Sequence, residues 1–421
     1  MELTKDQEYV FNEVMDKLGA PKNRTPVYYP NFKYITIGGY AGTGKTFLIS
    51  ILRNEIYKIF RNRNIAFVTF TGKASSVLKG KLEDNNAIFS GDFIGTIHSL
   101  IYVPELKYDK NTHRMIITKW VKKPELQYDL IFVDEASMVN KQIWFDLLNY
   151  KIPIIAVGDH GQLPPVGDQF NLMENLNYVL TEIKRQALDN PIIRLSQDIR
   201  NGKEIPYGFY DQNNKSVFKL SWKSEECKKI FNNLDFTSEE MIVLCGMNKT
   251  RVSINQMIRN KLGFINPEPY PSEKIIFLKN NYTSKVMNGM LGKNLFLLYE
   301  DKDVYNMTVS LDGINEPYSG LVYNGCFGKE QYDLDYEKLQ ILTKKLKNKS
   351  KIPRNKIDKT ADTIDICDFG HTISVHKAQG SSKRKVVLFQ EKSYFWNEEF
   401  MRRWLYTGVT RAEEKLFIIT P

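Results

Sequence analysis

The sequence predicts an α/β protein with two parallel-sheet cores, each interrupted by a β-rich insert. Short apolar, β-branched runs are followed by polar turns and helical patterns at 34–60, 65–74, 130–137 and 154–165. The same pattern returns at 241–258 and again from residue 369 onward. Between these stretches, residues 270–362 contain short strands separated by Asn-Gly, Asp-Gly and Gly turns, as in a small β-barrel. A chain of 421 residues is long enough for two or more domains with separate cores.

A glycine-rich segment lies between the first predicted β-strand and the helical pattern at 47–60. Residues 39–46 read Gly-Tyr-Ala-Gly-Thr-Gly-Lys-Thr and match the pattern G-x-x-x-x-G-K-[ST]. Glycines let backbone N–H groups surround a polyphosphate at a helix N-terminus, where the helix dipole also favours anions. A chance glycine turn is the alternative, but the strand–loop–helix context argues against it. We therefore predict a nucleotide site in which Lys45 contacts the phosphates and Thr46 binds Mg²⁺, with these loop positions around the phosphates: Gly39, Ala41, Gly42, Thr43 and Gly44.

Polar turns also follow the predicted strands at 65–70, 130–133 and 154–157. Because the carboxyl ends of parallel strands lie at one edge of a sheet, we expect these turns beside the phosphate loop. Asp134 and Glu135 follow the second of these strands. Alone, an Asp-Glu pair is often a surface turn, but four apolar residues directly before it favour a site. Asp134 can hold Mg²⁺, and Glu135 can orient or deprotonate an attacking water.

Composition narrows the classes of partner and compartment. The 59 basic and 49 acidic residues give a formal charge of +10, which suits a polyanionic partner without proving one. The four cysteines show no zinc-type or disulfide-type spacing, which fits a reducing compartment. No apolar run reaches the roughly 18 residues of a membrane span, and the N-terminus lacks a signal-peptide pattern. We therefore expect a cytoplasmic protein with no membrane partner.

Three further segments carry weaker local signals. Thr4 is a good N-cap for an amphipathic helix, and helix periodicity alone would make Gln7 solvent-exposed. Two β-rich stretches at 100–120 flank the turn cluster 109–112 and predict a projecting hairpin, whose plain alternative is a surface ornament. The lysine-rich segment 344–359 is typical of a solvated surface.

The ordered motifs resemble those of the superfamily 1 helicases, and within them the 1B branch that contains RecD-like enzymes and the phage Dda helicase. Each motif is short and weak by itself, but nine in family order are specific. The similarity runs from residue 3 to the C-terminus through these segments: Leu3-Thr4-x-x-Gln7 (Q motif), 39–46 (I), 70–74 (Ia), 96–100 (Thr-Ile-His-Ser-Leu), 134–135 (II), 158–166 (III), 180–185 (IV), 371–380 (V) and 406–411 (VI).

This resemblance implies a domain organisation. RecA-like domain 1A would cover residues 1–185, with a hairpin insert 1B at about 99–128 that acts as a pin to split the duplex. RecA-like domain 2A would cover 186–284 and 363–421. An SH3-like insert, domain 2B, would cover 285–362.

The resemblance also implies roles around ATP, which would lie in the cleft between the two cores. Arg185 and Arg411 would stabilise charge on the γ-phosphate during its transfer. Gln7 would read the adenine edge, and Gln379 and Gly380 of motif V would complete the nucleotide site. The implied catalytic set is Lys45, Asp134, Glu135, Gln162, Arg185 and Arg411, with Thr46 and Asp134 as Mg²⁺ ligands.

Single-stranded DNA would cross both cores on the face away from the nucleotide. Polar contacts to phosphates would grip the strand without sequence choice. His98 and His376 have an alternative as buried hydrogen-bonding residues. The implied contacts are Thr71, Lys73, Thr96, His98 and Pro164 in the first core, and Asn248, Lys249, Thr372 and His376 in the second.

The leading hypothesis is a monomeric, ATP-dependent DNA helicase that acts on single-stranded and forked DNA. Its 5′ to 3′ direction is implied by the family alone. A single-strand-binding protein or a replisome component is a further expected partner in replication or recombination. The compact size suits a phage-encoded enzyme, which would work in the host cytoplasm.

Two alternatives stay open. An RNA-directed helicase of the same superfamily would use the same phosphate contacts, and ATPase stimulation by poly(dT) against poly(U) separates the two. The other is an ATP-gated clamp or a protein-displacing translocase that binds strands without unwinding, and it would be favoured if deletion of the hairpin left forked-duplex unwinding intact.

Overall fold

The computed structural model describes most of the chain, which falls into two compact units. The first comprises Met1–Glu204 and Asn397–Thr410, and the second comprises Ile205–Trp396 and Arg411–Pro421. This division differs from the expected boundary at residue 185. The described residues are 3–20, 25–109, 114–165, 170–183, 189–212, 215–281, 284, 286–314, 316–330, 341–342, 345–346 and 364–421, without the side chains of 106–109, 114–119, 212 and 215.

The first unit is built on a six-stranded parallel sheet in the order β3-β2-β6-β7-β1-β8. Its central strands are buried throughout, because apolar layers cover both faces of the sheet. The strand β1, which leads into the phosphate loop, lies between β7 and β8. The strands are β1 Tyr34–Gly39, β2 Ile65–Thr69, β3 Phe93–Thr96, β6 Leu130–Val133, β7 Ile154–Gly158 and β8 Tyr178–Leu180.

Several helices of the first unit begin at a residue whose side chain caps the helix. The side chain of Thr4 accepts a hydrogen bond from the Gln7 amide and caps α1, as predicted. The side chain of Asn397 caps α11 in the same way. The helices are α1 Lys5–Lys17, α2 Lys45–Ile59, α3 Gly72–Asp84, α4 Ile97–Ile101, η1 Ala136–Met138, α5 Lys141–Leu148, α7 Pro191–Arg200 and α11 Glu398–Val409.

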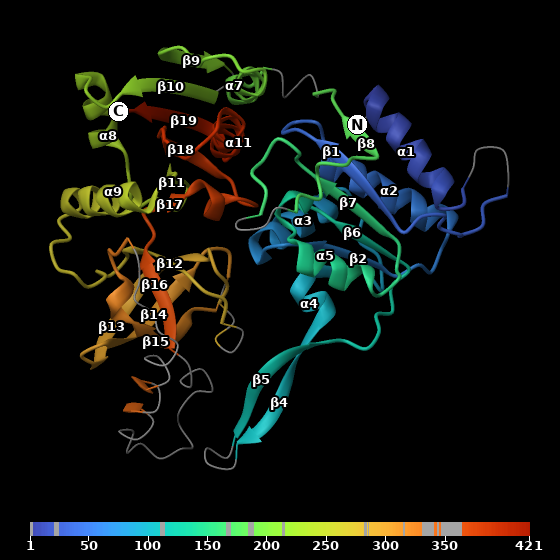
Figure 1. Ribbon diagram of the computed structural model, residues 1–421, viewed down its shortest axis with the longest axis horizontal. Helices are drawn as coiled ribbons and strands as arrows, with labels where there is room; N and C mark the ends of the chain where they lie inside the picture. The colour runs from blue at the N-terminus through green and yellow to red at the C-terminus, as the bar shows by residue number, and fades with distance from the viewer. Residues whose placement is uncertain are drawn as a thin grey trace. The chain divides into compact units, whose positions relative to one another are not determined.

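A two-stranded antiparallel hairpin follows α4. Its strands are β4, Tyr102–Asp109, and β5, Arg114–Lys122, with a register shift between Glu105 and Leu106. Figure 1 shows this ribbon projecting from α4. The hairpin predicted at 100–120 is therefore present. Most of the predicted turn 109–112 lies outside the described residues.

The second unit contains a six-stranded sheet in the order β17-β11-β18-β19-β10-β9. Its pairs are parallel except β9 with β10, an antiparallel edge hairpin that the sequence reasoning missed. The fold class of two parallel-sheet cores with β-rich inserts is confirmed. The elements are β9 Gly208–Gln212, β10 Lys215–Ser221, α8 Glu225–Asn233, β11 Met241–Cys245, α9 Asn248–Lys261, β17 Thr372–Ser374, η3 Val375–Ala378, β18 Lys383–Phe389 and β19 Ala412–Thr420.

A closed five-stranded barrel is inserted into this second sheet. The strand β16 closes it by pairing antiparallel with β12 and parallel with β15, and then runs on into β17 (Figure 1). The barrel therefore extends beyond the expected insert of 285–362 at both ends, because its first and last strands flank that range. The elements are β12 Lys274–Phe277, β13 Leu291–Asp301, β14 Val304–Leu311, β15 Tyr318–Tyr323, η2 Asn324–Cys326 and β16 Ile364–Phe369.

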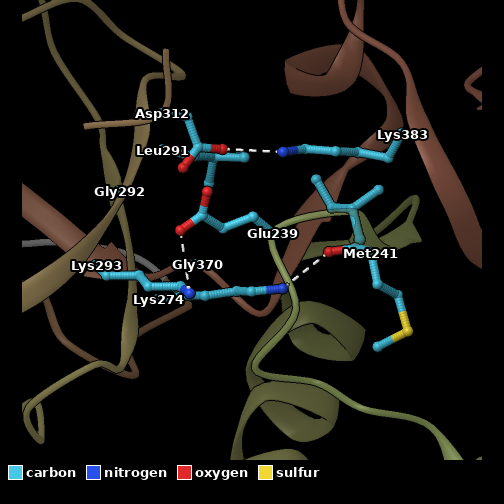
Figure 2. Close-up of a pocket in the computed structure, with 10 residues that line it drawn as sticks. Glu239, Met241, Lys274, Leu291, Gly292, Lys293, Asp312, Gly370 and Lys383 are labelled. Carbon is cyan, nitrogen blue, oxygen red and sulfur yellow. Dashed lines mark hydrogen bonds and ion pairs between the residues drawn. The ribbon is translucent and has the colours of Figure 1, made fainter. Parts of the chain in front are cut away.

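Lysines join the barrel to the sheet of the second unit around a small pocket (Figure 2). The Lys274 ammonium group donates to the carbonyl oxygens of Ser238 at 2.6 Å and Met241 at 2.8 Å. The Lys383 ammonium lies 2.9 Å from Asp312 Oδ2. Because Lys274 is buried, its pKa is lowered to about 8.

Candidate active site

The phosphate loop connects β1 to α2 through two residues with left-handed backbone. Gly42 has φ = 85° and Gly44 has φ = 75°, a conformation that glycine adopts at little cost. A Cβ atom on Gly39 would lie 2.6 Å from the Thr43 Oγ1 atom. The glycine pattern is therefore required by the backbone path, and the loop delivers the chain to the N-terminus of α2, where N–H groups lack intrahelical partners.

Lys45 is the first residue of α2, and its side chain folds along the loop. Its Nζ atom donates to the carbonyl oxygens of Gly39 at 2.7 Å and Tyr40 at 3.0 Å. The same atom lies 3.9 Å from Asp159 Oδ2. The ammonium group is therefore placed inside the loop that the sequence predicts to surround the phosphates.

Thr46, in the first turn of α2, contacts Asp134 at the carboxyl end of β6. The Thr46 hydroxyl donates to Asp134 Oδ2 at 3.3 Å. Asp134 Oδ1 accepts from the Glu135 amide at 2.9 Å, and Glu135 has φ = 54°, a rare conformation for a non-glycine residue. A hydroxyl and a carboxylate suit Mg²⁺, which uses one or two carboxylates together with phosphate and water oxygens. The residues present therefore fit magnesium bound with a nucleotide.

Asp159, which follows β7, is a buried hydrogen-bonding centre. Its Oδ1 atom accepts from the Gly161 amide at 2.9 Å. Its Oδ2 atom accepts from the Tyr406 hydroxyl at 2.7 Å and from Gln162 Nε2 at 3.5 Å. The Tyr406 hydroxyl also accepts from the Ala41 amide at 2.8 Å. One tyrosine of α11 therefore connects the phosphate loop with the turn after β7, and burial raises its pKa, which keeps the hydroxyl a donor.

Two further residues of α11 contact the turn after β7. The Thr407 hydroxyl accepts from the Leu163 amide at 3.0 Å. The Arg403 guanidinium donates to the carbonyl oxygens of His160 at 3.2 Å and Gln162 at 3.4 Å. Sequence reasoning gave motif VI a role only through Arg411 and missed these contacts. No local signal could have found them, because the partners are more than 240 residues apart in the chain.

Gln7 is fully buried, so the exposure expected from helix periodicity alone is wrong. Its Nε2 atom donates to the Thr43 carbonyl oxygen at 2.7 Å. Its Oε1 atom accepts from the Thr4 amide at 3.1 Å. Gln7 therefore joins the start of α1 to the phosphate loop, and its expected contact with adenine stays a prediction.

The remaining expected nucleotide-site residues are Arg185, Gln379, Gly380 and Arg411. Arg185 is outside the described residues. Arg411, Gln379 and Gly380 belong to the second unit. Arg411 is buried, and its guanidinium donates to the Ser381 carbonyl oxygen at 3.3 Å. Their contacts with a nucleotide stay predictions.

Among the expected DNA contacts of the first unit, two residues cap helices and the other three are half-buried. The Thr71 hydroxyl accepts from the Ala74 amide and caps α3, and the Thr96 hydroxyl caps α4. Lys73 and Pro164 are half-buried. His98 is also half-buried, and burial lowers its pKa. Both threonine hydroxyls therefore already have a structural use, and their phosphate contacts stay predictions.

The expected DNA contacts of the second unit differ in exposure. Asn248 and Lys249, the first residues of α9, are exposed. Thr372 is fully buried, and its backbone N–H and C=O both bond to the Asn255 side chain. His376 is half-buried, and burial lowers its pKa. Only Asn248 and Lys249 of these four present their side chains openly, and all four contacts stay predictions.

The fold and this site define a P-loop nucleoside triphosphatase. Two family models match the chain: one described as AAA domain over residues 28–168, and one described as UvrD-like helicase C-terminal domain over residues 369–419. The first covers the phosphate loop, Asp134 and Asp159. The second covers motifs V and VI.

Relatives and a solved structure extend the similarity along the chain. The ATP-dependent DNA helicase dda of Enterobacteria phage T4 is 26% identical, over 99% of this chain and 99% of its own length. An uncharacterised protein of Methanocaldococcus jannaschii is 26% identical over 90% of this chain, which spans only 36% of that relative. A structure described as DNA unwinding at forked DNA by two coordinating Pif1 helicases aligns with a TM-score of 0.51 at 18% identity, covering 99% of this chain and 92% of the other. These matches confirm the resemblance to the superfamily 1B helicases that the motifs indicate.

None of the described helices combines the length and the apolar character that crossing a bilayer requires.

Proposed function

We propose that this protein is an ATP-dependent DNA helicase that steps 5′ to 3′ along single-stranded DNA and unwinds duplex DNA. The observation that carries the proposal is the convergence of Lys45, Thr46, Asp134 and Asp159 on the phosphate loop, at the carboxyl ends of β1, β6 and β7. The phage T4 relative, a helicase aligned over nearly its whole length, supports the unwinding activity.

ATP binds at the phosphate loop, where Thr46 and Asp134 would hold Mg²⁺. Lys45 binds the β- and γ-phosphates, and Glu135 orients the attacking water and accepts its proton. Gln162 is held beside the site by Asp159. Magnesium supplies charge neutralisation at the phosphates when bound.

The two RecA-like domains 1A and 2A couple this chemistry to movement. Arg185 and Arg411 contact the γ-phosphate, so domain closure depends on ATP and hydrolysis releases it. The hairpin β4–β5 acts as the pin of insert 1B, and the barrel forms insert 2B. A single-strand-binding protein as partner, a monomeric working state and a cytoplasmic location complete the proposal.

The test compares wild type with Lys45→Ala and Glu135→Gln in DNA-stimulated ATPase and forked-duplex unwinding. Glu135→Gln keeps ATP and DNA binding but lowers kcat by roughly 10²-fold or more, because the water loses its base. Lys45→Ala loses turnover and most of the nucleotide-dependent change in DNA affinity, because the phosphates lose their cation.

Glu8→Gln, at an exposed site of α1, is the matched control and keeps wild-type rates. Wild-type turnover in Glu135→Gln would contradict the assignment. Stimulation by poly(U) but not poly(dT) would favour the RNA-directed alternative, and stimulated ATPase without any unwinding would favour the translocase.

A further inference from the structure

Two neighbouring aromatic side chains stand out of the loop between β18 and α11. Tyr394 is 100% exposed and Phe395 is 92% exposed, the two highest values among the large apolar side chains described as exposed. Their ring centroids are 6.1 Å apart at an interplanar angle of 85°, so the rings do not stack on each other. Each ring therefore keeps at least one face open to a planar partner.

The loop that carries this pair is fastened at its start. The buried Glu391 carboxylate accepts hydrogen bonds from the Gly246 amide, the Met247 amide and the Thr250 hydroxyl. These three groups belong to the turn after β11 and the first turn of α9. Because a buried carboxylate with three donors is costly to release, the loop is held against this turn.

The loop is also fastened at its end. The Trp396 ring packs directly on Gly246, where an added Cβ atom would overlap it. The Trp396 amide donates to the Ser393 carbonyl oxygen at 3.1 Å, and the Phe395 amide donates to the Ser393 hydroxyl at 3.3 Å. These hydrogen bonds hold the backbone on both sides of the pair, and the two aromatic rings are exposed to solvent.

The turn to which this loop is fastened carries two of the expected phosphate contacts. Asn248 and Lys249 fall between Met247 and Thr250, which Glu391 holds, and both are exposed. Lys392, two residues before Tyr394, is also exposed. Of the acidic residues near the pair, Glu391 is buried and accepts from its three donors, whereas Glu398 and Glu399 in the first turn of α11 are exposed.

We propose that Tyr394 and Phe395 stack on bases of the single-stranded DNA whose phosphates lie at Asn248 and Lys249. This rests on the proposed function and adds a base-contacting platform to it. Aromatic stacking tolerates any sequence, because every base has a π-face. Exposed aromatic rings with Lys392 on the same loop and Lys249 on the adjoining turn suit a strand with bases and phosphates better than an apolar protein surface, which would desolvate these lysines.

The test measures binding of a labelled oligo(dT) strand by fluorescence anisotropy at fixed salt. The double variant Y394A/F395A raises Kd by roughly ten- to a hundredfold. Y394W/F395W retains wild-type affinity, because tryptophan also stacks. Y394L/F395L, apolar but not aromatic, behaves like the alanine variant. Phe296→Ala is the matched control, since Phe296 on the barrel strand β13 is 55% exposed and keeps wild-type Kd.

A strand with abasic sites isolates the base contact. Wild type and Y394A/F395A bind it with equal Kd, because no base remains to stack. A defect of the double variant that persists on the abasic strand, or an unchanged Kd on oligo(dT), overturns the proposal while leaving the helicase assignment intact. A wild type that neither binds oligo(dT) nor responds to it in ATPase assays overturns both.

Discussion

Gln7 supports the phosphate loop through a buried hydrogen bond to the Thr43 carbonyl oxygen. A glutamine side chain suits this place because one end donates to the loop while the other accepts from the Thr4 amide at the start of α1. The helix cap and the nucleotide loop therefore share one side chain. A residue that the motif assigns to adenine also has a structural task.

We predict that Gln7→Leu destabilises the protein by about 1–3 kcal/mol, because it leaves the Thr43 carbonyl oxygen buried without a donor. The loop then becomes less ordered, and KM for ATP rises. Thermal unfolding and steady-state ATPase kinetics measure the two effects. Gln256→Leu, at an exposed position of α9, is the control and leaves both unchanged. A Gln7→Leu protein with wild-type KM would show that the loop is ordered without this bond.

Two threonines that cap helices are also expected DNA contacts. Thr71 and Thr96 were singled out from motifs as phosphate contacts, and each is also the N-cap of a helix. N-capping satisfies backbone donors that would otherwise lack partners. A capping hydroxyl accepts a hydrogen bond through one lone pair and has further hydrogen-bonding capacity, so replacing either threonine changes stability as well as any DNA contact.

The barrel strand β12 begins with a buried lysine, Lys274. Lys274 is buried at the junction with β11, where its ammonium group donates hydrogen bonds to carbonyl oxygens and not to carboxylates (Figure 2). Desolvation is the largest cause of its lowered pKa, and the neighbouring Lys383 lowers it further. The charged ammonium is therefore costly in the folded second unit.

This cost predicts a pH dependence of stability. The pKa of Lys274 is about 8 when folded against 10.5 for an ordinary lysine, so below pH 8 the group is charged in both states and the burial cost is fully present. Between pH 8 and 10.5 the folded protein binds fewer protons, so its stability rises with pH, by up to about 3 kcal/mol. Denaturant unfolding from pH 7.5 to 10 measures the rise.

Lys274→Met removes the titrating group, so we expect its free energy of unfolding not to rise between pH 8 and 10 as it does in the wild type. Lys385→Met replaces an exposed lysine of β18 and keeps the wild-type pH dependence. Parallel pH profiles for wild type and Lys274→Met would show that the buried ammonium remains charged throughout. Differences between the variants, rather than absolute stabilities, isolate the effect from other titrating groups.

At the scale of the whole molecule, the chain passes between its two compact units after Glu204, Trp396 and Thr410. Helix α11 belongs to the first unit, where its side chains form hydrogen bonds with Asp159, Ala41 and Leu163 among others. Arg411 is the residue at which the chain enters the second unit for the last time. An arginine at such a place can link nucleotide chemistry to movement of the units.

We predict that Arg411→Ala retains ATP and DNA binding but lowers DNA-stimulated kcat by about 10³-fold or more, the contribution expected of an arginine at the γ-phosphate. Arg384→Ala, at an exposed position of β18, is the control. Because Arg411 is buried, thermal unfolding is measured alongside, and Arg411→Lys keeps the charge while losing the bidentate geometry. Undiminished turnover in a folded Arg411→Ala protein would remove Arg411 from the proposed mechanism.

Much of the fold could be predicted because its signals are local. The strand–loop–helix at 34–60 and the strands before Asp134 and Asp159 follow from apolar runs and turn residues a few positions apart. The barrel boundaries could not be predicted in this way. Strand β16 belongs to the barrel only because it pairs with β12 and β15, and such pairing is decided between distant segments.

The sequence by itself determined the phosphate loop, the acidic residues after β6 and β7, and the order of the motifs, because each depends on residue type and spacing over a few positions. Only the tertiary structure decided that Tyr406 reaches Asp159, 247 residues away, that Gln7 is buried under the loop, and that Glu391 clamps the loop carrying Tyr394 and Phe395. Such contacts arise when distant segments bury polar groups together, and the cost of leaving those groups unpaired then selects one arrangement.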